Sequence, residues 1–593
     1  MGESIHGEYE RRRAAFAGEF DRMSARSSSL TLLLLGAVGV LVYLVWQAFQ
    51  PGGHAWWAAV PLAVAVGLAP AQLRVRKASQ RAMRLLDVYE RGIARVDGSK
   101  PQSGHTGEAF HEDGHLYERD LNILGPDSIF GMLATTRTAV GQRALAQLLL
   151  HGADVETVRA RQAAVRELAP VLDLRERVAL LGRSAFEELP AESFDHWLDT
   201  PRGGLAVWMR WVLIALTLGW MALVVAALLH RADYDTLPQH VGALLALQGA
   251  FALWLRPRVM AEMEGSQRLA GQTNILRDGL KLVQEQTFSA ELLRRLQKDA
   301  VGEERALKSL SGSLMLVEQR AKEWYYAPAL LLAVGSHAAI SLEAWKRQHG
   351  EAMRKWVRTW AEFEALLALG TYAAEHQENV YPEIVEGGAT FVAEGLAHPL
   401  LAASVAVRND VRLDSATRFL LISGSNMAGK STLLRAVGCN AVLALAGAPV
   451  CARGAKMSAL RVGASLALVD SLAEGKSKFL AEVERLRDIV ALAGSGACLF
   501  LIDEIFSGTN SADRRAAAEA VLRALIRAGA VGALSTHDLA LAELAEVPEL
   551  GGLNVHMASP VEDDPLAFDY LLKPGVNRTT NALAIVRMLG LGA

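Results

Sequence analysis

Hydrophobic residues gather in four long runs in the first half of the chain. Residues 30–49 and 55–73 contain no charged side chain, and a short Pro- and Gly-bearing loop separates them. Residues 205–229 and 241–255 form a second pair, of which the last run is short and includes Gln248. Because a helix needs about 20 apolar residues to cross a bilayer, the pattern predicts two transmembrane hairpins. Buried core helices are the alternative for all four runs, and a cleavable signal peptide is the alternative for the first.

Basic residues flank the two predicted hairpins on one side only. Several arginines precede residue 30 and a basic run follows residue 73, whereas the loop between these runs has no basic side chain. Arg256 and Arg258 follow the fourth run, and the loop before that run carries only Arg231. Positively charged flanks stay in the cytoplasm. We therefore expect a multi-pass protein of the inner (cytoplasmic) membrane, with both termini and the large polar segments in the cytoplasm.

In the rest of the chain, the pattern of hydrophobic and polar residues changes near residue 381. Residues 74–204 and 267–378 have the spacing of amphipathic helices. Within the second segment residues 325–342 are apolar, but Pro328 interrupts them and a fifth crossing would move the C-terminal third outside, so a buried helix is predicted. After Pro382, short β-rich runs alternate with helices, as in a parallel α/β domain. The predicted domains are residues 1–104 with the first hairpin, 105–204, 205–255 with the second hairpin, 256–380 and 381–593.

Composition excludes several classes of function. The chain has 593 residues, 51% of them hydrophobic, and a formal net charge of −3, so overall basicity gives no sign of nucleic-acid binding. Its three cysteines form no Cys-x-x-Cys pair, which argues against a disulfide framework and a cysteine-rich metal site. His105, His111 and His115 lack the regular spacing of zinc ligands. We expect no zinc and no haem.

A phosphate-binding loop follows the strand-like residues 419–422. The loop reads Gly-x-x-x-x-Gly-Lys-Ser and leads into a helical run. Glycines let backbone N–H groups close around phosphates, while the lysine reaches the β and γ oxygens and the serine hydroxyl ligates Mg²⁺. The nucleotide-binding residues predicted in this loop are Gly424, Ser425, Asn426, Met427, Ala428, Gly429, Lys430, Ser431 and Thr432.

A second buried-strand run, residues 498–502, ends in an acidic pair. Asp503 at this place is expected to hold the Mg²⁺ shell together with Ser431, and Glu504 to polarise the attacking water. His537 follows another strand-like run and is the candidate sensor of the γ-phosphate. Solvated acids at a strand end and a structural histidine are the alternatives. The order of these motifs favours catalysis, with ATP and Mg²⁺ as the cofactors.

These motifs resemble the ATPase domain of the MutS mismatch-repair family. The matching segments there are residues 423–432, His398-Pro399, Asn409-Asp410, residues 475–479 with Glu482, residues 503–505, 507–510 and 580–584. Residues 120–125, 136–141, 161–162 and 331–364 resemble the family's helical core. The resemblance implies a homodimer, in which Ser477 of the signature loop reaches the nucleotide of the partner subunit, and possible DNA binding.

The chain departs from the family pattern at several places. Ala428 replaces a glycine of the phosphate loop, and Lys478 replaces a threonine of the signature loop. The family's base-stacking aromatic would fall at Ala406 or Val407, neither of which is aromatic. The mismatch-reading N-terminal domains have no counterpart, and apolar runs occupy that end.

The expected architecture is α plus α/β: N-terminal transmembrane helices, a helical MutS-like core or lever, and a C-terminal phosphate-loop ATPase domain of the ABC type. The expected function is that of a membrane-anchored ATPase with DNA-binding, mismatch-repair-like activity. An ATP-driven membrane machine is one alternative, although residues 471–477 lack the Leu-Ser-Gly-Gly-Gln of transporters. A nucleotide-switched scaffold without DNA binding is another. Candidate DNA contacts, with a solvated helix face as the favoured alternative, are Lys346, Arg347, Arg354, Lys355 and Arg358.

Overall fold

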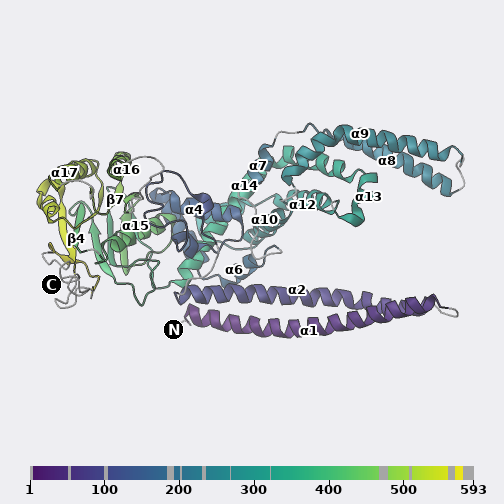
Figure 1. Ribbon diagram of the computed structural model, residues 1–593, viewed down its shortest axis with the longest axis horizontal. Helices are drawn as coiled ribbons and strands as arrows, with labels where there is room; N and C mark the ends of the chain where they lie inside the picture. Colours follow the sequence, from purple (N-terminus) through teal and green to yellow (C-terminus); the bar gives the residue numbers. More distant parts are fainter. Residues whose placement is uncertain are drawn as a thin grey trace, which may run out of the picture.

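The chain forms an elongated molecule with an α/β domain at one end and two helical hairpins that extend toward the other (Figure 1). A helical core joins these parts. The computed structural model describes residues 4–50, 55–98, 105–182, 193–200, 203–229, 235–266, 269–320, 322–425, 427–466, 478–506, 511–558 and 568–577.

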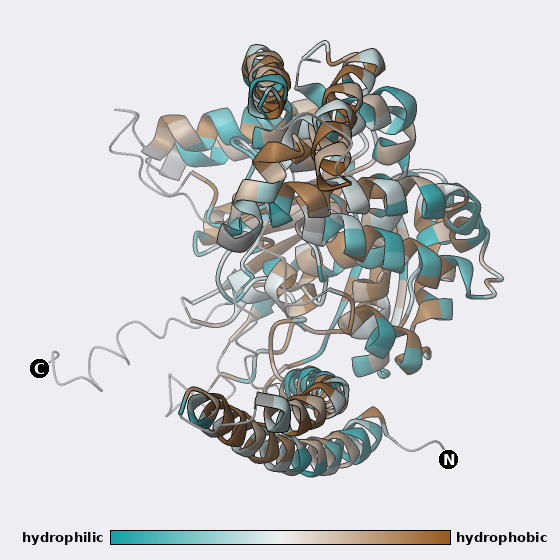
Figure 2. Cartoon of the chain, turned by 90° about the vertical axis from the view of Figure 1, so that its right-hand side faces the viewer, coloured by the Kyte–Doolittle hydropathy of each residue, from teal (hydrophilic) through white to brown (hydrophobic). Residues whose placement is uncertain are grey.

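The first hairpin consists of α1 (Ile5–Ala48) and α2 (Ala59–Val96), with the 3-10 turn η1 (Ala55–Ala58) between them. The two helices pack along their length and carry an exposed apolar surface toward the tip (Figure 2). Near the base, the rings of Tyr9 and Tyr89 pack edge to face at 5.3 Å. Within the described residues, three helices are long and apolar enough to cross a membrane: Ile5–Ala48, Trp56–Val96 and Val207–Leu228.

The second hairpin pairs α8 (Val207–Leu228) with α9 (Leu237–Ser266). Helix α8 meets the length and hydropathy needed for a span, whereas α9 does not within the described chain. Gln248, the polar residue in the middle of α9, is buried and accepts a hydrogen bond of 3.1 Å from the indole nitrogen of Trp220 in α8. The oxygen of the Gln248 side chain is therefore satisfied inside the hairpin.

The prediction of one buried helix over residues 325–342 is wrong in part. The segment is broken into α13 (Glu323–Leu331) and α14 (Val334–Glu375), which meet at a bend of 70°. Ala333 lies between them with φ 48°, in the left-handed region that ends helices. The start of α14 is buried because it packs against α8 and α9, whereas much of α13 is exposed. Tertiary packing, which periodicity does not reveal, separates the two halves.

The helical core surrounds α14. Three of its helices begin at side-chain caps, Ser128, Thr138 and Asp154, which accept hydrogen bonds from the first turn. The core helices are α3 (Ile129–Leu133), α4 (Ala139–Leu150), α5 (Val155–Leu168), α6 (Leu172–Ala179), α7 (Ser193–Asp199), α10 (Leu269–Gln284), α11 (Glu291–Asp299) and α12 (Glu303–Gln319), with the 3-10 turn η2 (Glu108–Phe110) before them.

Glu364 joins α14 to the start of α4. Its carboxylate accepts hydrogen bonds from the backbone N–H groups of Arg137 and Thr138 and from the Thr138 hydroxyl. Burial raises the pKa of Glu364 to about 7, although these donors act in the opposite direction. The protonated form is thus favoured in the folded protein relative to the unfolded chain.

We expect Glu364 to make stability depend on pH. A carboxyl whose folded pKa is raised contributes stability that is present below the unfolded pKa and is lost as pH rises through the folded pKa. For Glu364 this window runs from 4.5 to about 7. The contribution lost is about 3 kcal/mol, since one pKa unit corresponds to about 1.4 kcal/mol. Thermal unfolding across this range should show a shallower pH dependence for Glu364→Gln, which cannot titrate, than for the wild type. Parallel curves would contradict the assignment.

The α/β domain contains two sheets. The smaller has the order β1-β5-β2-β3, formed by β1 (Glu383–Val385), β5 (Gly454–Ser458), β2 (Phe391–Leu396) and β3 (Asn409–Leu413). The larger has the order β10-β9-β4-β8-β7-β6, formed by β10 (Lys573–Pro574), β9 (Gly552–Met557), β4 (Phe419–Gly424), β8 (Val531–Thr536), β7 (Cys498–Ile502) and β6 (Arg461–Ser465).

In the larger sheet, β9, β4, β8, β7 and β6 run parallel, so their carboxyl ends meet at one edge. The helices of this domain are α15 (Lys430–Ala446), α16 (Lys478–Ala493) and α17 (Ser511–Arg527), with the 3-10 segments η4 (Leu539–Glu546) and η5 (Pro548–Leu550). Helix α15 also packs against α4 and α5 of the core. The mixed helical and α/β architecture expected from the sequence is confirmed.

Candidate active site

The loop between β4 and α15 has a backbone that few residues besides glycine adopt. Gly424 has φ 154° and Gly429, the N-cap of α15, has φ 95°. A β-carbon at Gly424 would lie 2.3 Å from the carbonyl oxygen of Met557, so a side chain there would displace β9. Met427 also has a positive φ, of 71°. The backbone N–H groups at the start of α15 are left free by helix geometry and favour an anion.

Lys430 is buried at the first position of α15. Its Nζ donates hydrogen bonds to the carbonyl oxygens of Gly424 at 2.8 Å and Ser425 at 3.0 Å. Burial lowers the pKa of Lys430, while the nearby carboxylates of Asp503 and Glu504 partly offset this effect. The Ser425 hydroxyl is buried and has no hydrogen-bond partner among the described residues. A loop with an unsatisfied hydroxyl, a buried cation and free N–H groups fits a polyphosphate.

The acidic pair lies at the carboxyl end of β7, next but one to β4 in the sheet. The Asp503 carboxylate accepts a hydrogen bond from the Ser535 hydroxyl of β8, which fixes its orientation. The backbone N–H of Glu504 donates to the carbonyl oxygen of Ser535 at 3.1 Å. Glu504 has φ 51°, an unusual conformation for a non-glycine residue that is typical of functional sites.

A cavity of about 620 Å³ lies between the phosphate loop and the segment 396–409. Glu504 lines it, as do these residues of the loop and of the helix start: Ser425, Met427, Ala428, Gly429, Lys430, Ser431 and Thr432. The structure therefore brings most of the predicted nucleotide-binding residues to one space. Asn426 and Ser477 lie outside the described residues, as do residues 507–510 and 580–584 of the family-like motifs.

His537 lies beside the cavity rather than in its wall. It follows β8, and its Nδ1 is 3.6 Å from the Glu504 Oε1. The predicted sensor is thus placed against the predicted catalytic glutamate. From this position the His537 imidazole can orient the Glu504 carboxylate.

Sequence analysis missed Tyr570 as a cavity residue. Its backbone, with φ 54°, is fixed from β3: the Asn409 Nδ2 donates to the Tyr570 carbonyl oxygen at 3.1 Å, and the Leu572 N–H donates to the Asn409 Oδ1 at 2.7 Å. The Tyr570 ring packs on Gly429, where a β-carbon would lie 3.0 Å from its Cδ1. Ala406 and Val407 offer no aromatic side chain, and among the described residues that line the cavity Tyr570 is the one Phe, Tyr or Trp. No local sequence pattern identifies Tyr570, because Asn409, which fixes its backbone, is 161 positions away in the chain.

Removing the Tyr570 ring should weaken nucleotide binding. We expect the Tyr570 ring to stack on the base of a bound nucleotide, a contact that contributes about 1–3 kcal/mol, so Tyr570→Ala should raise the Kd for ATP by about 5- to 160-fold. Tyr570→Phe keeps the ring and should bind like the wild type. Titration calorimetry on the two variants checks this, and equal affinities for Tyr570→Ala and Tyr570→Phe would contradict it.

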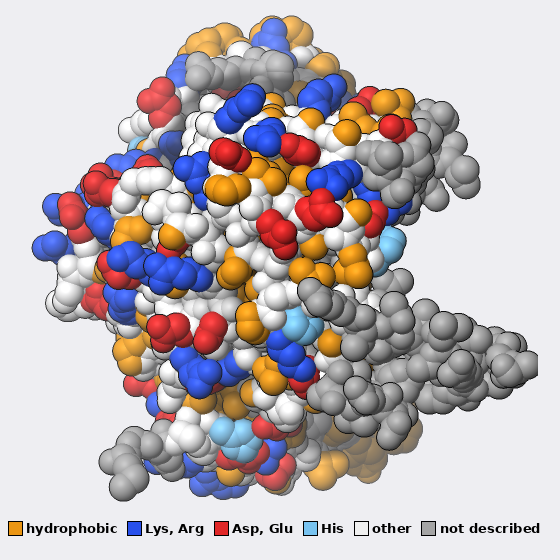
Figure 3. Space-filling view, turned by 90° about the vertical axis from the view of Figure 1, so that its left-hand side faces the viewer, with side chains coloured by type: hydrophobic (Ala, Val, Ile, Leu, Met, Phe, Trp, Pro, Cys, Tyr) orange, Lys and Arg blue, Asp and Glu red, His pale blue; other side chains and the backbone are white. Residues whose placement is uncertain are grey.

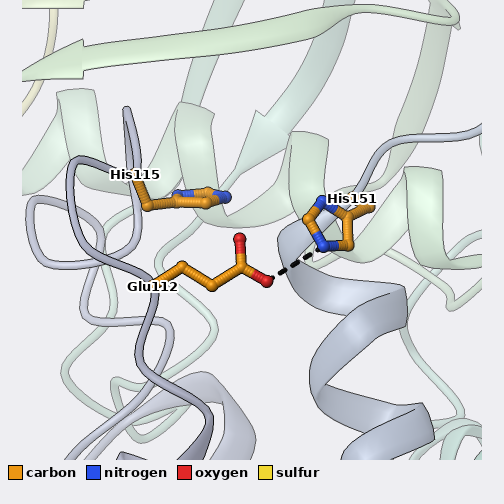
Figure 4. Close-up of side chains that lie close together, drawn as sticks. All are labelled: Glu112, His115 and His151. Atoms are coloured by element: carbon orange, nitrogen blue, oxygen red, sulfur yellow. Dashed lines mark hydrogen bonds and ion pairs between the residues drawn. The ribbon is translucent and has the colours of Figure 1, made fainter.

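The three histidines considered as a loose cluster do not form one site. His115 instead lies near Glu112 and His151, within reach of a shared ion by distance alone (Figure 4). However, the His115 Nδ1 faces the backbone N–H groups of Tyr117 at 3.4 Å and Glu118 at 3.2 Å, and its Nε2 faces the Leu150 carbonyl oxygen at 3.0 Å. These contacts favour the tautomer with a proton on Nε2. No lone pair of His115 then points toward the other two side chains, so the group fits a hydrogen-bonded cluster better than a metal site.

Three of the five predicted basic positions of α14 face carboxylates, whereas Arg347 and Arg358 are exposed. Lys346 is buried and lies 3.6 Å from the Glu262 carboxylate, Arg354 contacts Asp199 at 2.6 Å, and Lys355 contacts Asp299 at 2.7 Å. On the face of the α/β end shown in Figure 3, basic and acidic side chains are interspersed among the residues coloured by type. A DNA contact is therefore not supported at Lys346, Arg354 and Lys355, and the contact at Arg347 and Arg358 stays a prediction.

Comparison with known proteins agrees with the site. Residues 420–593 match MutS domain V. The chain is 32% identical over 293 residues to the DNA mismatch repair protein MutS 2 of Halobacterium salinarum, which covers 48% of this chain and 32% of the relative. It is 33% identical over 281 residues to the DNA mismatch repair protein MutS of Thermus caldophilus, covering 46% of this chain and 33% of the relative. The chain thus spans about a third of the length of these curated relatives. Over residues 420–593, the chain is similar to the MutS family.

Proposed function

We propose that the protein is a membrane-anchored ATPase that acts on DNA as a dimer. The observation that carries the ATPase assignment is that Lys430 and Glu504, from separate strand ends, line one cavity with a strained phosphate loop. MutS proteins are ATPases as a family, and hydrolysis by this chain is the inference.

The side chains divide the chemistry of hydrolysis among them. Lys430 and the N–H groups of the phosphate loop hold the β- and γ-phosphates. Ser431 and Asp503 would hold Mg²⁺, which neutralises charge on the phosphate oxygens when bound. Glu504 orients the attacking water and accepts its proton. His537, 3.6 Å from Glu504, positions that carboxylate. Ser477 of a second subunit would complete the site.

The helical core is linked to the ATPase site by a buried contact. Arg485 of α16, the helix after the signature loop, contacts the Asp120 carboxylate of the core at 2.6 Å and donates to the His115 carbonyl oxygen at 2.8 Å. Arg435 of α15 donates to the Asp120 carbonyl oxygen at 3.1 Å. Asp120 therefore contacts both α15, which begins at the phosphate loop, and α16. A movement of either helix on ATP binding would shift Asp120 and the core residues around it. We infer that these contacts couple ATP binding to DNA.

The apolar hairpins supply the membrane anchor in this proposal. No residue in the apolar window of α1 is buried, and only 11% of the apolar window of α8 is, which would be unfavourable in water. With basic flanks in the cytoplasm, the α/β domain would face the ATP pool from the inner membrane.

ATP turnover by the full-length protein in liposomes tests the proposal. We expect turnover that mismatched or branched duplex DNA stimulates severalfold, and that stimulation should fall steeply with salt if phosphate contacts carry the binding. Liposomes without the protein measure the background. Turnover that no DNA changes would remove DNA from the proposal, and absence of turnover above background would overturn the ATPase assignment.

A further inference from the structure

The short helix α13 does not behave as a core helix. Residues 324–336 carry no charged side chain. The chain bends by 70° between Tyr325–Leu331 and α14. Together the two helices have the length and hydropathy of a membrane span, which neither has alone. A helix that ends at such a bend leaves carbonyl groups without partners in the helix.

Gln248 shows how deep this bend lies along the second hairpin. Its Nε2 donates to the Leu331 carbonyl oxygen, at the end of α13, at 2.7 Å. Its Oε1 accepts from the indole N–H of Trp220 at 3.1 Å and from the Thr217 hydroxyl at 3.4 Å. Gln248 lies near the middle of α9, and Trp220 and Thr217 lie near the middle of α8. The end of α13 is therefore level with the middle of the hairpin and not with its base.

This contact is what a bend inside a membrane requires. A backbone carbonyl in hydrocarbon has no water to bond and needs a protein donor. A buried glutamine in an apolar helix pair likewise needs partners. Gln248 meets both needs at once, because its amide Nε2 donates to the Leu331 carbonyl oxygen and its Oε1 accepts from the Trp220 indole N–H of α8.

The outer face of α13 is apolar and uncovered. Tyr326 is 64% exposed, Leu330 69% and Leu331 47%. Met315 and Leu316, near the end of α12, are also exposed. In Figure 1, α13 lies in height between the two hairpins, on the side toward which both extend. The apolar surface of α13 thus lies alongside the surfaces assigned to the membrane.

We propose that residues 323–334 form a re-entrant membrane element whose outer face contacts lipid acyl chains. The inference rests on the proposed membrane anchoring of the hairpins. The chain enters from α12, descends along α13 to the level of Gln248, and returns along α14. Entry and exit on one side keep the α/β domain on the same side as the N-terminus, which a fifth crossing would not. The occupant is lipid, because the depth set by Gln248 places this face beside the apolar part of α8 and α9.

Spin labels on the full-length protein in liposomes test the element. A label at Leu330→Cys should be reached by oxygen, which concentrates in the bilayer, more than by a water-soluble nickel chelate. Leu218→Cys on α8 is the lipid control, and Val301→Cys, an exposed apolar residue of the core, is the aqueous control. Wild-type protein treated alike gives the background from Cys439, Cys451 and Cys498. Tyr326→Cys provides a second site if Leu330→Cys does not fold.

The outcomes separate the two proposals. Oxygen preference at Leu330 and Leu218, with chelate preference at Val301, supports the re-entrant element. Chelate preference at Leu330 while Leu218 prefers oxygen overturns it and leaves the anchoring intact. Chelate preference at both overturns the anchoring itself. Protection of Leu330 from both reagents would mean that protein, such as a second copy, covers α13, and would also overturn the lipid contact. Adding Gln248→Leu should shift the Leu330 label toward water, since Leu331 then loses its donor.

Discussion

Glu504→Gln is expected to lower ATP turnover by about 10²- to 10⁴-fold, the range that a positioned general base contributes. Glutamine keeps the size of the side chain but cannot accept the proton of the attacking water. The groups that hold the phosphates, Lys430 and the backbone of the phosphate loop, are untouched, so ATP binding should persist. Steady-state turnover measured beside equilibrium binding of ATP separates the two effects.

Two further variants sharpen this result. Glu549→Gln changes an exposed glutamate of the same domain and should leave turnover unchanged. His537→Ala should lower turnover less than Glu504→Gln, because His537 acts through its contact with Glu504 at 3.6 Å. Turnover near the wild-type level in Glu504→Gln would show that the catalytic assignment is wrong. A larger loss in His537→Ala than in Glu504→Gln would move the central role to the histidine.

The parts of the site that lie close together in the sequence were predictable. The phosphate loop is contiguous, because the chain itself turns from β4 into α15 around the anion site. Asp503 and Glu504 end a strand, and parallel strands bring their carboxyl ends to one edge. Tyr570 was not predictable in this way. Its position depends on hydrogen bonds to Asn409, and no local pattern encodes a contact between residues so far apart.

The helical part shows the same limit. Hydropathy identified the apolar stretches of both hairpins, because each stretch is one continuous run of apolar residues in the sequence. The bend between α13 and α14 was missed, since hydropathy treats residues 325–342 as one run. The two halves differ because the start of α14 packs on the second hairpin, whereas the end of α13 accepts a hydrogen bond from Gln248 through the Leu331 carbonyl oxygen. That information belongs to the folded chain.

The ion pair between Arg95 and Glu375 carries the other large expected effect. Arg95 lies in the last turn of α2 and Glu375 is the last residue of α14, so the pair fixes the first hairpin to the end of the central helix. The side chains are 14% and 2% exposed, and the nitrogen–oxygen distance is 2.5 Å. The Tyr9 hydroxyl also donates to Glu375 at 3.2 Å. Removing one partner of a buried pair leaves an uncompensated charge.

We therefore expect Arg95→Ala to lower the free energy of unfolding by about 3–5 kcal/mol, the usual cost of breaking a buried pair. Arg91→Ala breaks the exposed pair with Asp87 one turn earlier on the same helix and should cost at most about 1 kcal/mol. Denaturant titration of the detergent-solubilised protein compares them. Because burying both charges is itself unfavourable, Arg95→Met combined with Glu375→Leu should recover much of the loss. If the double variant were as unstable as the two single losses added together, the cost would come from packing at this junction and not from an unpaired charge.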